Sequence, residues 1–175
     1  MRGLVHIYTG DGKGKTTAAI GLGVRACGCG MRVVMVQFLK GIQTGEMDSL
    51  KALGPNFALH RGTQLKKFTW QMNEMEKAQT AAQQNSIFEY AVDCAMRGAC
   101  DLLILDEVLG AVSSGMLKKG SLLEFIRSKP EDLELVLTGR GADGELIELA
   151  DYVSEIKAVK HPADKGIKGR KGIEY

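Results

Sequence analysis

The sequence predicts an α/β fold, in which a mostly parallel, six-stranded sheet lies between two layers of helices. Three observations support this prediction. Short apolar runs alternate with helix-like stretches along the whole chain, which is the pattern of strand-helix-strand units. Several runs are apolar throughout, as in parallel strands covered on both faces. The first run also leads through a glycine-rich loop into a helix, an order typical of phosphate-binding sites in such sheets.

The expected strands are short and evenly distributed. Four are nearly continuous apolar runs, a fifth is weaker, and the last alternates between apolar and polar residues, which suits an edge strand. In chain order they are residues 4–8, 33–38, 57–60, 102–105, 133–137 and 152–159.

Five helices are expected between these strands. The first is rich in alanine and glycine, which lowers helix propensity but allows close packing on a sheet. Gly28 and Gly30 supply its end. The third is by far the longest. The expected helices are residues 15–29, 46–53, 71–97, 119–128 and 144–150.

Length and composition indicate one domain over residues 1–175, which the motifs below identify as a predicted nucleotide-binding domain. The chain is 45% hydrophobic and 25% charged, with a net charge of +2, so a strongly nucleic-acid-directed charge balance is disfavoured. Residues 157–175 are nevertheless basic, which suits either a solvated tail or a flap over an anionic ligand, and we expect this segment to fold near the active site.

Targeting and cysteine patterns favour a cytoplasmic location. No apolar run approaches the ~20 residues of a membrane span, and no signal-peptide core precedes the first strand. The four cysteines form no C-x-x-C pair, which disfavours a structural zinc site.

Residues that follow the strands predict a site for a metal-bound polyphosphate, because the carboxyl ends of parallel strands meet at one edge of the sheet. The first loop curls its backbone N–H groups toward a phosphate, and Lys15 adds a positive charge. Thr16 can offer its hydroxyl to Mg²⁺, and Asp106 ends an apolar strand, where an acidic partner of that ion is expected.

The loop departs at one position from the usual phosphate-binding pattern G-x-x-x-x-G-K-[ST], because Thr9 stands where the first glycine is expected. A dinucleotide site is disfavoured, since G-x-G-x-x-G would need glycine in place of Lys15. The sequence therefore predicts a P-loop, RecA-like nucleotide-binding core. That core by itself does not identify the reaction, because ATPases, kinases and switches share it.

Several further stretches resemble the ATP:corrinoid adenosyltransferases, the P-loop enzymes that attach 5′-deoxyadenosine to the cobalt of cobalamin precursors. The matching pieces span nearly the whole chain in order: TGDGKGKTTAA, VRACGCG, MVQFLKG, FTW, LILDE, LTGRGADGELIELAD and VKHPADKGIKGRKGIEY.

The resemblance implies that Co(I) of a reduced corrinoid attacks C5′ of ATP and expels triphosphate. Lys13, Lys15 and Arg140 would then be the catalytic charges that stabilise the leaving group, together with Mg²⁺. The predicted metal contacts are Thr16, Asp106 and Glu107. The predicted ATP contacts are Thr9, Gly10, Asp11, Gly12, Lys13, Gly14, Lys15, Thr16, Thr17, Arg25, Arg140 and His161.

Phe68 and Trp70 match the aromatic pair that, in the family, packs on the lower face of the corrin and keeps an axial ligand off cobalt. The resemblance also implies a homodimer and an electron-donor flavoprotein as partner. Without the resemblance, the two aromatic residues would be expected to pack in a core. Arg25 would then be expected on a solvated helix face, and Glu107 could be the water-activating base of an ordinary ATPase.

The chain departs from the family's usual pattern in a few places. Lys66-Lys67 precede FTW where glycine is usual, Ala163 replaces an aromatic residue, and Gly169-Arg170 replace Ala-Gln. We also expect no N-terminal extension of the kind that covers the site in some relatives.

Two other functions stay open on sequence alone. One is a RecA-like ATPase or nucleotide switch that acts on nucleic acid or a protein partner. The other is a nucleotide-binding regulatory domain that has lost catalysis.

Overall fold

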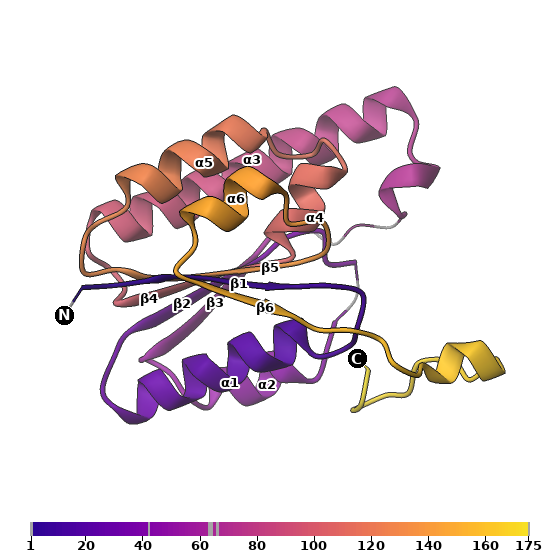
Figure 1. The fold of residues 1–175 in the computed structure, drawn as a ribbon, viewed down its shortest axis with the longest axis horizontal. Coiled ribbons are helices and arrows are strands. Elements are labelled where there is room, and N and C mark those ends of the chain that lie inside the picture. The colour runs from indigo at the N-terminus through magenta and orange to yellow at the C-terminus, as the bar shows by residue number, and fades with distance from the viewer. Residues whose placement is uncertain (1, 42, 63–64, 66, 175) are drawn as a thin grey trace.

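The computed structural model describes residues 2–41, 43–62, 65 and 67–174 (Figure 1). Its centre is one six-stranded sheet in which every pairing is parallel. The spatial order of the strands is β3-β2-β4-β5-β1-β6. Their bounds are Val5–Thr9 (β1), Val33–Gln37 (β2), Phe57–Arg61 (β3), Leu102–Asp106 (β4), Glu134–Thr138 (β5) and Tyr152–Glu155 (β6).

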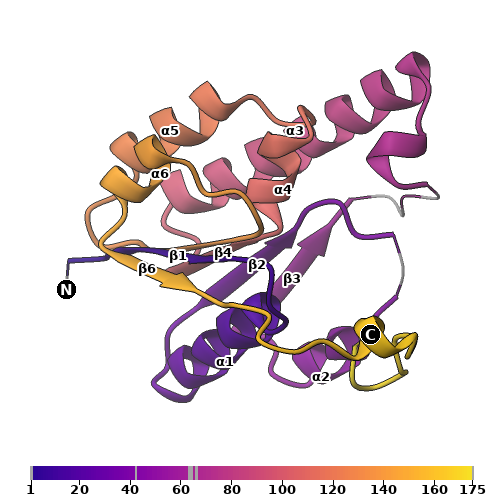
Figure 2. The same cartoon turned by 45° about the vertical axis from the view of Figure 1, so that its right-hand side comes forward.

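Helices cover both faces of the sheet, so the predicted three-layer α/β fold is confirmed (Figures 1 and 2). One face carries α1 (Lys15–Gly28) and α2 (Glu46–Lys51). The other carries α3 (Glu74–Met96), α4 (Val108–Ser113), α5 (Lys119–Ser128) and α6 (Gly144–Leu149). Two 3-10 turns, η1 (Thr69–Gln71) and η2 (Pro162–Lys165), lie in the segments that leave the sheet.

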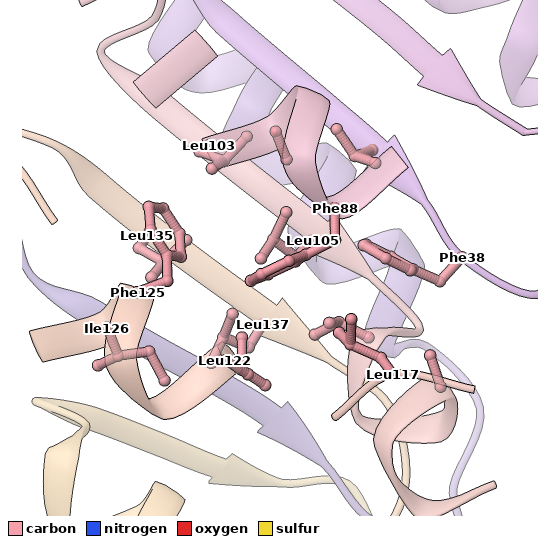
Figure 3. Packing of buried hydrophobic residues seen from close by; sticks show 14 of the residues in the cluster. Phe38, Phe88, Leu103, Leu105, Leu117, Leu122, Phe125, Ile126, Leu135 and Leu137 are labelled. Carbon is pink, nitrogen blue, oxygen red and sulfur yellow. The ribbon is translucent and has the colours of Figure 1, made fainter. Parts of the chain in front are cut away.

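The larger apolar core fills the space between the sheet and the α3–α6 layer (Figure 3). Phe88 of α3 meets Phe125 of α5 edge to face, with ring centroids 6.0 Å apart. Inward residues of β4 and β5, such as Leu105 and Leu137, are fully buried beneath them. This layer makes the two central strands a rigid base for the residues at their ends.

The smaller core lies under α1, where the helix approaches the sheet closely. A Cβ atom at Gly23 would lie 2.6 Å from the ring of Phe57, so a side chain there would collide with β3. The small residues predicted to allow tight packing of this helix therefore serve that purpose, at least at Gly23.

Element boundaries differ from the predictions where local contacts decide them. The helix expected over residues 71–97 begins at Glu74, because the Asn73 side chain accepts a hydrogen bond from the Glu76 N–H and the Glu76 carboxylate accepts one from the Asn73 N–H. The last strand ends at Glu155 rather than at residue 159, because the chain then turns over the glycine loop. Helix α4 was not predicted, since its N-cap residue, Glu107, makes no side-chain capping bond and is not one of the residue types that usually mark a helix start.

Within the part of the chain that is described, none of the helices has the length and apolar character needed to cross a lipid bilayer.

Candidate active site

The glycine loop joins β1 to α1, and two of its glycines are required by the segment that packs against it. A Cβ atom at Gly10 or Gly12 would lie 2.5 or 2.7 Å from the carbonyl oxygen of Ile156, just beyond β6. The Gly12 N–H donates to that same oxygen at 2.7 Å. Thr9, in contrast, is the last residue of β1 and pairs with Glu155, so its backbone is extended and needs no glycine.

Lys15 opens α1 and folds back over the loop. Its Nζ donates to the carbonyl oxygens of Gly10 at 2.6 Å and Gly12 at 2.8 Å. Partial burial, followed by the nearby Arg140 guanidinium, lowers the pKa of Lys15. The ammonium is therefore held at the loop by neutral partners, which an anionic ligand can replace.

Asp106 is the polar centre of this edge of the sheet, and its side chain is fully buried at the end of β4. Its Oδ1 accepts hydrogen bonds from Thr16 at 2.8 Å and from Thr138 at 2.7 Å. Its Oδ2 accepts one from Gln37 Nε2 at 3.2 Å and lies 3.4 Å from Lys40 Nζ. One carboxylate thus joins α1 to the ends of β2, β4 and β5.

A polar pocket of about 710 Å³ opens over the glycine loop, and we call it the loop pocket. The loop and the start of α1 form its floor, the start of α2 forms one wall, and the C-terminal segment forms another. Its lining residues are Asp11, Gly12, Lys13, Gly14, Lys15, Thr16, Thr17, Ile20, Lys40, Thr44, Gly45, Glu46, Ser49, Arg140, His161, Gly172, Ile173 and Glu174.

Two charged contacts cross the loop pocket. Lys13 Nζ lies 3.1 Å from a carboxylate oxygen of Glu174, and Arg140 Nε lies 3.7 Å from Asp11 Oδ1. Hydrogen bonds from Arg170, with a smaller contribution from Lys13, lower the pKa of Glu174 to about 2. A carboxylate of the C-terminal segment thus forms an ion pair with one of the loop's cations, Lys13.

A second, more apolar pocket of about 580 Å³ lies beside the first, and we call it the aromatic pocket. The rings of Phe68 and Trp70 stack, with centroids 4.5 Å apart and planes at 5°, although the two residues are 61% and 76% exposed. Lys67 anchors this segment to α3 through an ion pair with Glu76 at 2.5 Å. The lining residues are Leu39, Lys40, Gly41, Leu65, Lys67, Phe68, Thr69, Trp70, Gln71 and Glu107.

The structure gathers most of the predicted site residues. Those that line the loop pocket are Asp11, Gly12, Lys13, Gly14, Lys15, Thr16, Thr17, Arg140 and His161, while Thr9 and Gly10 lie just before them. Phe68 and Trp70 line the aromatic pocket.

Two predicted residues lie elsewhere. Arg25 is exposed in the last turn of α1, roughly 15 Å along the helix from Lys15 at 1.5 Å per residue. Glu107 lines the aromatic pocket, while only its neighbour Asp106 bonds Thr16. Its backbone is left-handed, with φ 62°, and its N–H donates to Thr138 Oγ1 at 2.9 Å. Burial, and then the Asp106 carboxylate, raise the pKa of Glu107.

Three further residues, Gln37, Lys40 and Thr138, belong to the strand-end stretches 37–41 and 138–140 that the sequence places at this site, but the sequence assigned them no role, and a fourth, Glu174, was not predicted. Gln37 and Thr138 end β2 and β5, and Lys40 lies three residues beyond β2, so the strand-end rule points to them, although it does not say which side chains turn inward. Glu174 has no local signal, because only the path of the C-terminal segment brings it to Lys13. Of the residues that depart from the family pattern, Lys66 lies outside the described residues.

Comparison with known proteins gives consistent matches over the whole chain. A family model described as ATP:corrinoid adenosyltransferase BtuR/CobO/CobP matches residues 1–175. The chain is 35% identical over 175 residues to the corrinoid adenosyltransferase of Escherichia coli (strain K12), which covers 99% of this chain and 86% of that protein.

Two further relatives have nearly the same sequence identity to this chain. The corrinoid adenosyltransferase CobA of Salmonella typhimurium is 35% identical over 175 residues, with 99% of this chain and 86% of the relative covered. The corrinoid adenosyltransferase of Pseudomonas aeruginosa is 34% identical, with 99% and 84% covered.

Proposed function

The chain belongs to the ATP:corrinoid adenosyltransferase family, and we propose that its two adjoining pockets hold the two substrates of that reaction. As a member, it is an enzyme that transfers the adenosyl group of ATP to a corrinoid. The single observation that carries the assignment of the pockets is their adjacency, since Lys40 lines both. Adenosyl transfer needs C5′ of ATP beside cobalt, and two neighbouring pockets of opposite character meet this requirement.

The loop pocket takes the triphosphate. Its cations Lys13, Lys15 and Arg140 surround a helix N-terminus, and oriented N–H groups and positive charges stabilise a leaving polyanion. No protein nucleophile is needed, because reduced cobalt is itself the nucleophile that attacks C5′. The chain's role is then to position ATP and to stabilise the charge of the departing triphosphate.

Thr16 and Asp106 are the residues that would hold Mg²⁺. Their oxygens already lie 2.8 Å apart, and a hydroxyl beside a carboxylate suits this hard cation. The described residues contain no group of three or more His, Cys, Asp or Glu side chains fit for a metal ion, so the nucleotide and water would complete its coordination. When bound, Mg²⁺ would neutralise phosphate charge. The metal contact expected of Glu107 and the ATP contact expected of Arg25 stay predictions.

The aromatic pocket takes the corrinoid. Exposed, stacked rings at Phe68 and Trp70 offer a flat apolar surface of the kind that a corrin face can cover. An aromatic surface on the lower face would also exclude an oxygen or nitrogen ligand from cobalt, which makes Co(II) easier to reduce. The ion pair of Lys67 with Glu76 supports a defined position for this segment.

We further propose a cytoplasmic homodimer that receives its electron from a flavoprotein, as the family resemblance implies. Edge strand β6 is exposed along its length, including Tyr152 and Val153, and is available for contact with a second copy. Light scattering after size exclusion would test the dimer, and reduction of bound corrinoid by a flavodoxin-type donor would test the partner.

The main test is incubation of the protein with Mg²⁺, ATP and chemically reduced cobalamin without oxygen. We expect a light-sensitive Co–C product and one triphosphate for each product. Lys15→Ala is the matched control for the loop pocket. Formation of ADP and phosphate without a Co–C product would contradict the proposal and favour the ATPase alternative, which stimulation by DNA or RNA would then support.

A further inference from the structure

Lys40 is the cation that stands between the two pockets. It follows β2 after a turn in which Leu39 has φ 54°, a left-handed conformation that is unfavourable for a residue other than glycine. The turn is secured on both sides, because Phe38 N donates to the Asp106 carbonyl at 2.9 Å and Leu39 N donates to Gln84 Oε1 at 3.0 Å. The backbone of Lys40 is therefore placed by buried partners.

The ammonium of Lys40 is directed to Asp106. Its Nζ lies 3.4 Å from Oδ2, and within the described chain this is the one Lys or Arg side chain that forms an ion pair with that carboxylate. The next residue, Glu107, adds a second, partly buried carboxyl group. Among the nearby cations, Lys40 does most to lower the pKa of that group, against the rise that burial and Asp106 cause. A buried carboxylate needs a paired cation, so Lys40 supplies the charge that this pair of acids requires.

A second observation points to a further ligand at the same place. Gln37 is only 1% exposed, and while its Nε2 donates to Asp106, its Oε1 has no partner among the residues that the structure describes. Buried side-chain oxygens are normally bonded, so Gln37 Oε1 can accept a further hydrogen bond. A hydrated cation between Thr16 and Asp106 would bring water donors to this position.

We propose that Lys40 is a positioning residue that serves as the counter-ion of Asp106 in the metal-free enzyme and is displaced toward the boundary of the two pockets when Mg²⁺ and ATP bind. This rests on the proposed function. Two cations within a few ångströms of one carboxylate repel each other, so the metal and the ammonium compete for it. The flexible lysine side chain can leave Asp106, and the phosphates of ATP then become its partner.

Competition of this kind has a thermodynamic consequence. Mg²⁺ alone binds weakly, because it must displace Lys40 while no phosphate is present to receive the ammonium. ATP removes that cost, so Mg²⁺ and ATP strengthen each other's binding, and the coupling is reciprocal. The side chain that carries the coupling also lines the corrinoid pocket.

The test compares the wild type with Lys40→Met, which keeps an unbranched side chain without the charge, and with Lys40→Arg, which keeps the charge. Lys51→Met is the matched control, since Lys51 is an exposed lysine of α2 that lines neither pocket. Calorimetric titrations measure the binding of MgCl₂ alone, of ATP without Mg²⁺, and of ATP with Mg²⁺.

We expect Lys40→Met to bind MgCl₂ alone about tenfold more tightly than the wild type, and the factor by which Mg²⁺ improves ATP binding to fall about tenfold, within the usual range of coupled sites. Lys40→Arg and Lys51→Met should resemble the wild type. Unchanged or weaker binding of MgCl₂ by Lys40→Met would overturn the proposal, as would an equal change in Lys51→Met.

Thermal unfolding covers the case in which the variant is unstable. If Lys40→Met unfolds in metal-free buffer, restoration of the fold by MgCl₂ supports a counter-ion role, and failure of MgCl₂ to restore it overturns that role. None of these measurements uses a corrinoid. Absence of a Co–C product from the wild type would therefore refute the proposed function separately, whereas these titrations decide the role of Lys40.

Discussion

The loop pocket and the aromatic pocket lie side by side but are built in opposite ways. The first is formed by the glycine loop and the start of α1, and its Thr16 is bonded to Asp106, which is fully buried and contacts four neighbouring side chains. The second is made largely by a segment outside the sheet, whose rings at Phe68 and Trp70 are mostly exposed.

The difference follows from what each pocket is proposed to bind. A polyphosphate is held by directed N–H groups and charges, which must be placed accurately by a rigid base. A flat macrocycle is held by apolar area, which has to remain exposed until the ligand covers it. We therefore expect substitutions in the loop pocket to affect chemistry or stability strongly, and those in the aromatic pocket to affect the corrinoid step more selectively.

The largest effect should come from Lys15→Ala. Loss of the ammonium removes a charge that faces the leaving triphosphate, and we expect kcat/KM for ATP to fall about 100- to 1,000-fold. Because the partners of Lys15 among the described residues are two loop carbonyls, Tm should change little. The rate at which adenosylated corrinoid forms measures kcat/KM, and a thermal melt measures Tm. A variant with most of its activity would break the contrast between the pockets.

Asp106→Asn should have the next largest effect, and on stability. The amide nitrogen would face hydroxyl and amide donors that now bond a carboxylate, so we expect the free energy of unfolding to fall by about 1–3 kcal/mol. Urea denaturation measures it. Asp48→Asn, on the surface of α2, is the control and should leave the midpoint unchanged. Equal stability of the two variants would mean that the buried network contributes little.

Trp70→Ala should act on the corrinoid alone. The exposed ring contributes little to the fold, so we expect unchanged ATP binding and an about tenfold slower reduction of bound Co(II), the size of one lost aromatic contact. Anaerobic spectroscopy of the cobalt follows the reduction, and Met75→Ala, an exposed residue at the start of α3, is the control. An unchanged reduction rate would show that the aromatic pair does not face the corrin.

The smallest effect should be the pH dependence of stability that Glu107 produces at the boundary of the pockets. Its pKa is raised above 4.5 by burial and by Asp106, so the folded state holds the proton more tightly than the unfolded state. The free energy of unfolding therefore falls as pH rises from 4.5 through the raised pKa.

Glu107→Gln lacks this proton, so its unfolding curve should lose that pH slope, and above the window it should be more stable by roughly 0.5 kcal/mol. Urea denaturation at a series of pH values measures the difference. Parallel pH profiles for the two proteins would show that Glu107 is fully solvated in the folded state.

Local patterns predicted the elements well. Residues 119–128 were expected as a helix and form α5 with those bounds, and all six expected strands are present. The glycine loop, Lys15 and Thr16 also follow from sequence, because a strand that leads into G-K-T has few alternatives. The pairing of Thr16 with Asp106, 90 residues away, could be anticipated from the strand-end rule alone.

Side-chain direction at the ends of strands could not be predicted. Asp106 and Glu107 are adjacent in sequence and were treated alike, yet the Asp106 carboxylate is buried against Thr16, while Glu107, whose backbone is left-handed, lines the aromatic pocket. Lys40 and Glu174 reach the site through a strained turn and through the path of the C-terminal segment, and neither leaves a periodic signal.

By itself, then, the sequence determined the α/β fold, the phosphate loop and the family, because each depends on short motifs and on hydrophobic periods that neighbouring residues set. Only the tertiary structure decided that β5 lies between β1 and β4, that Thr138 and Lys40 meet at Asp106, and that Thr9 needs no glycine because it pairs with β6. These features depend on contacts between residues far apart in the chain, and the packing of whole layers selects among them.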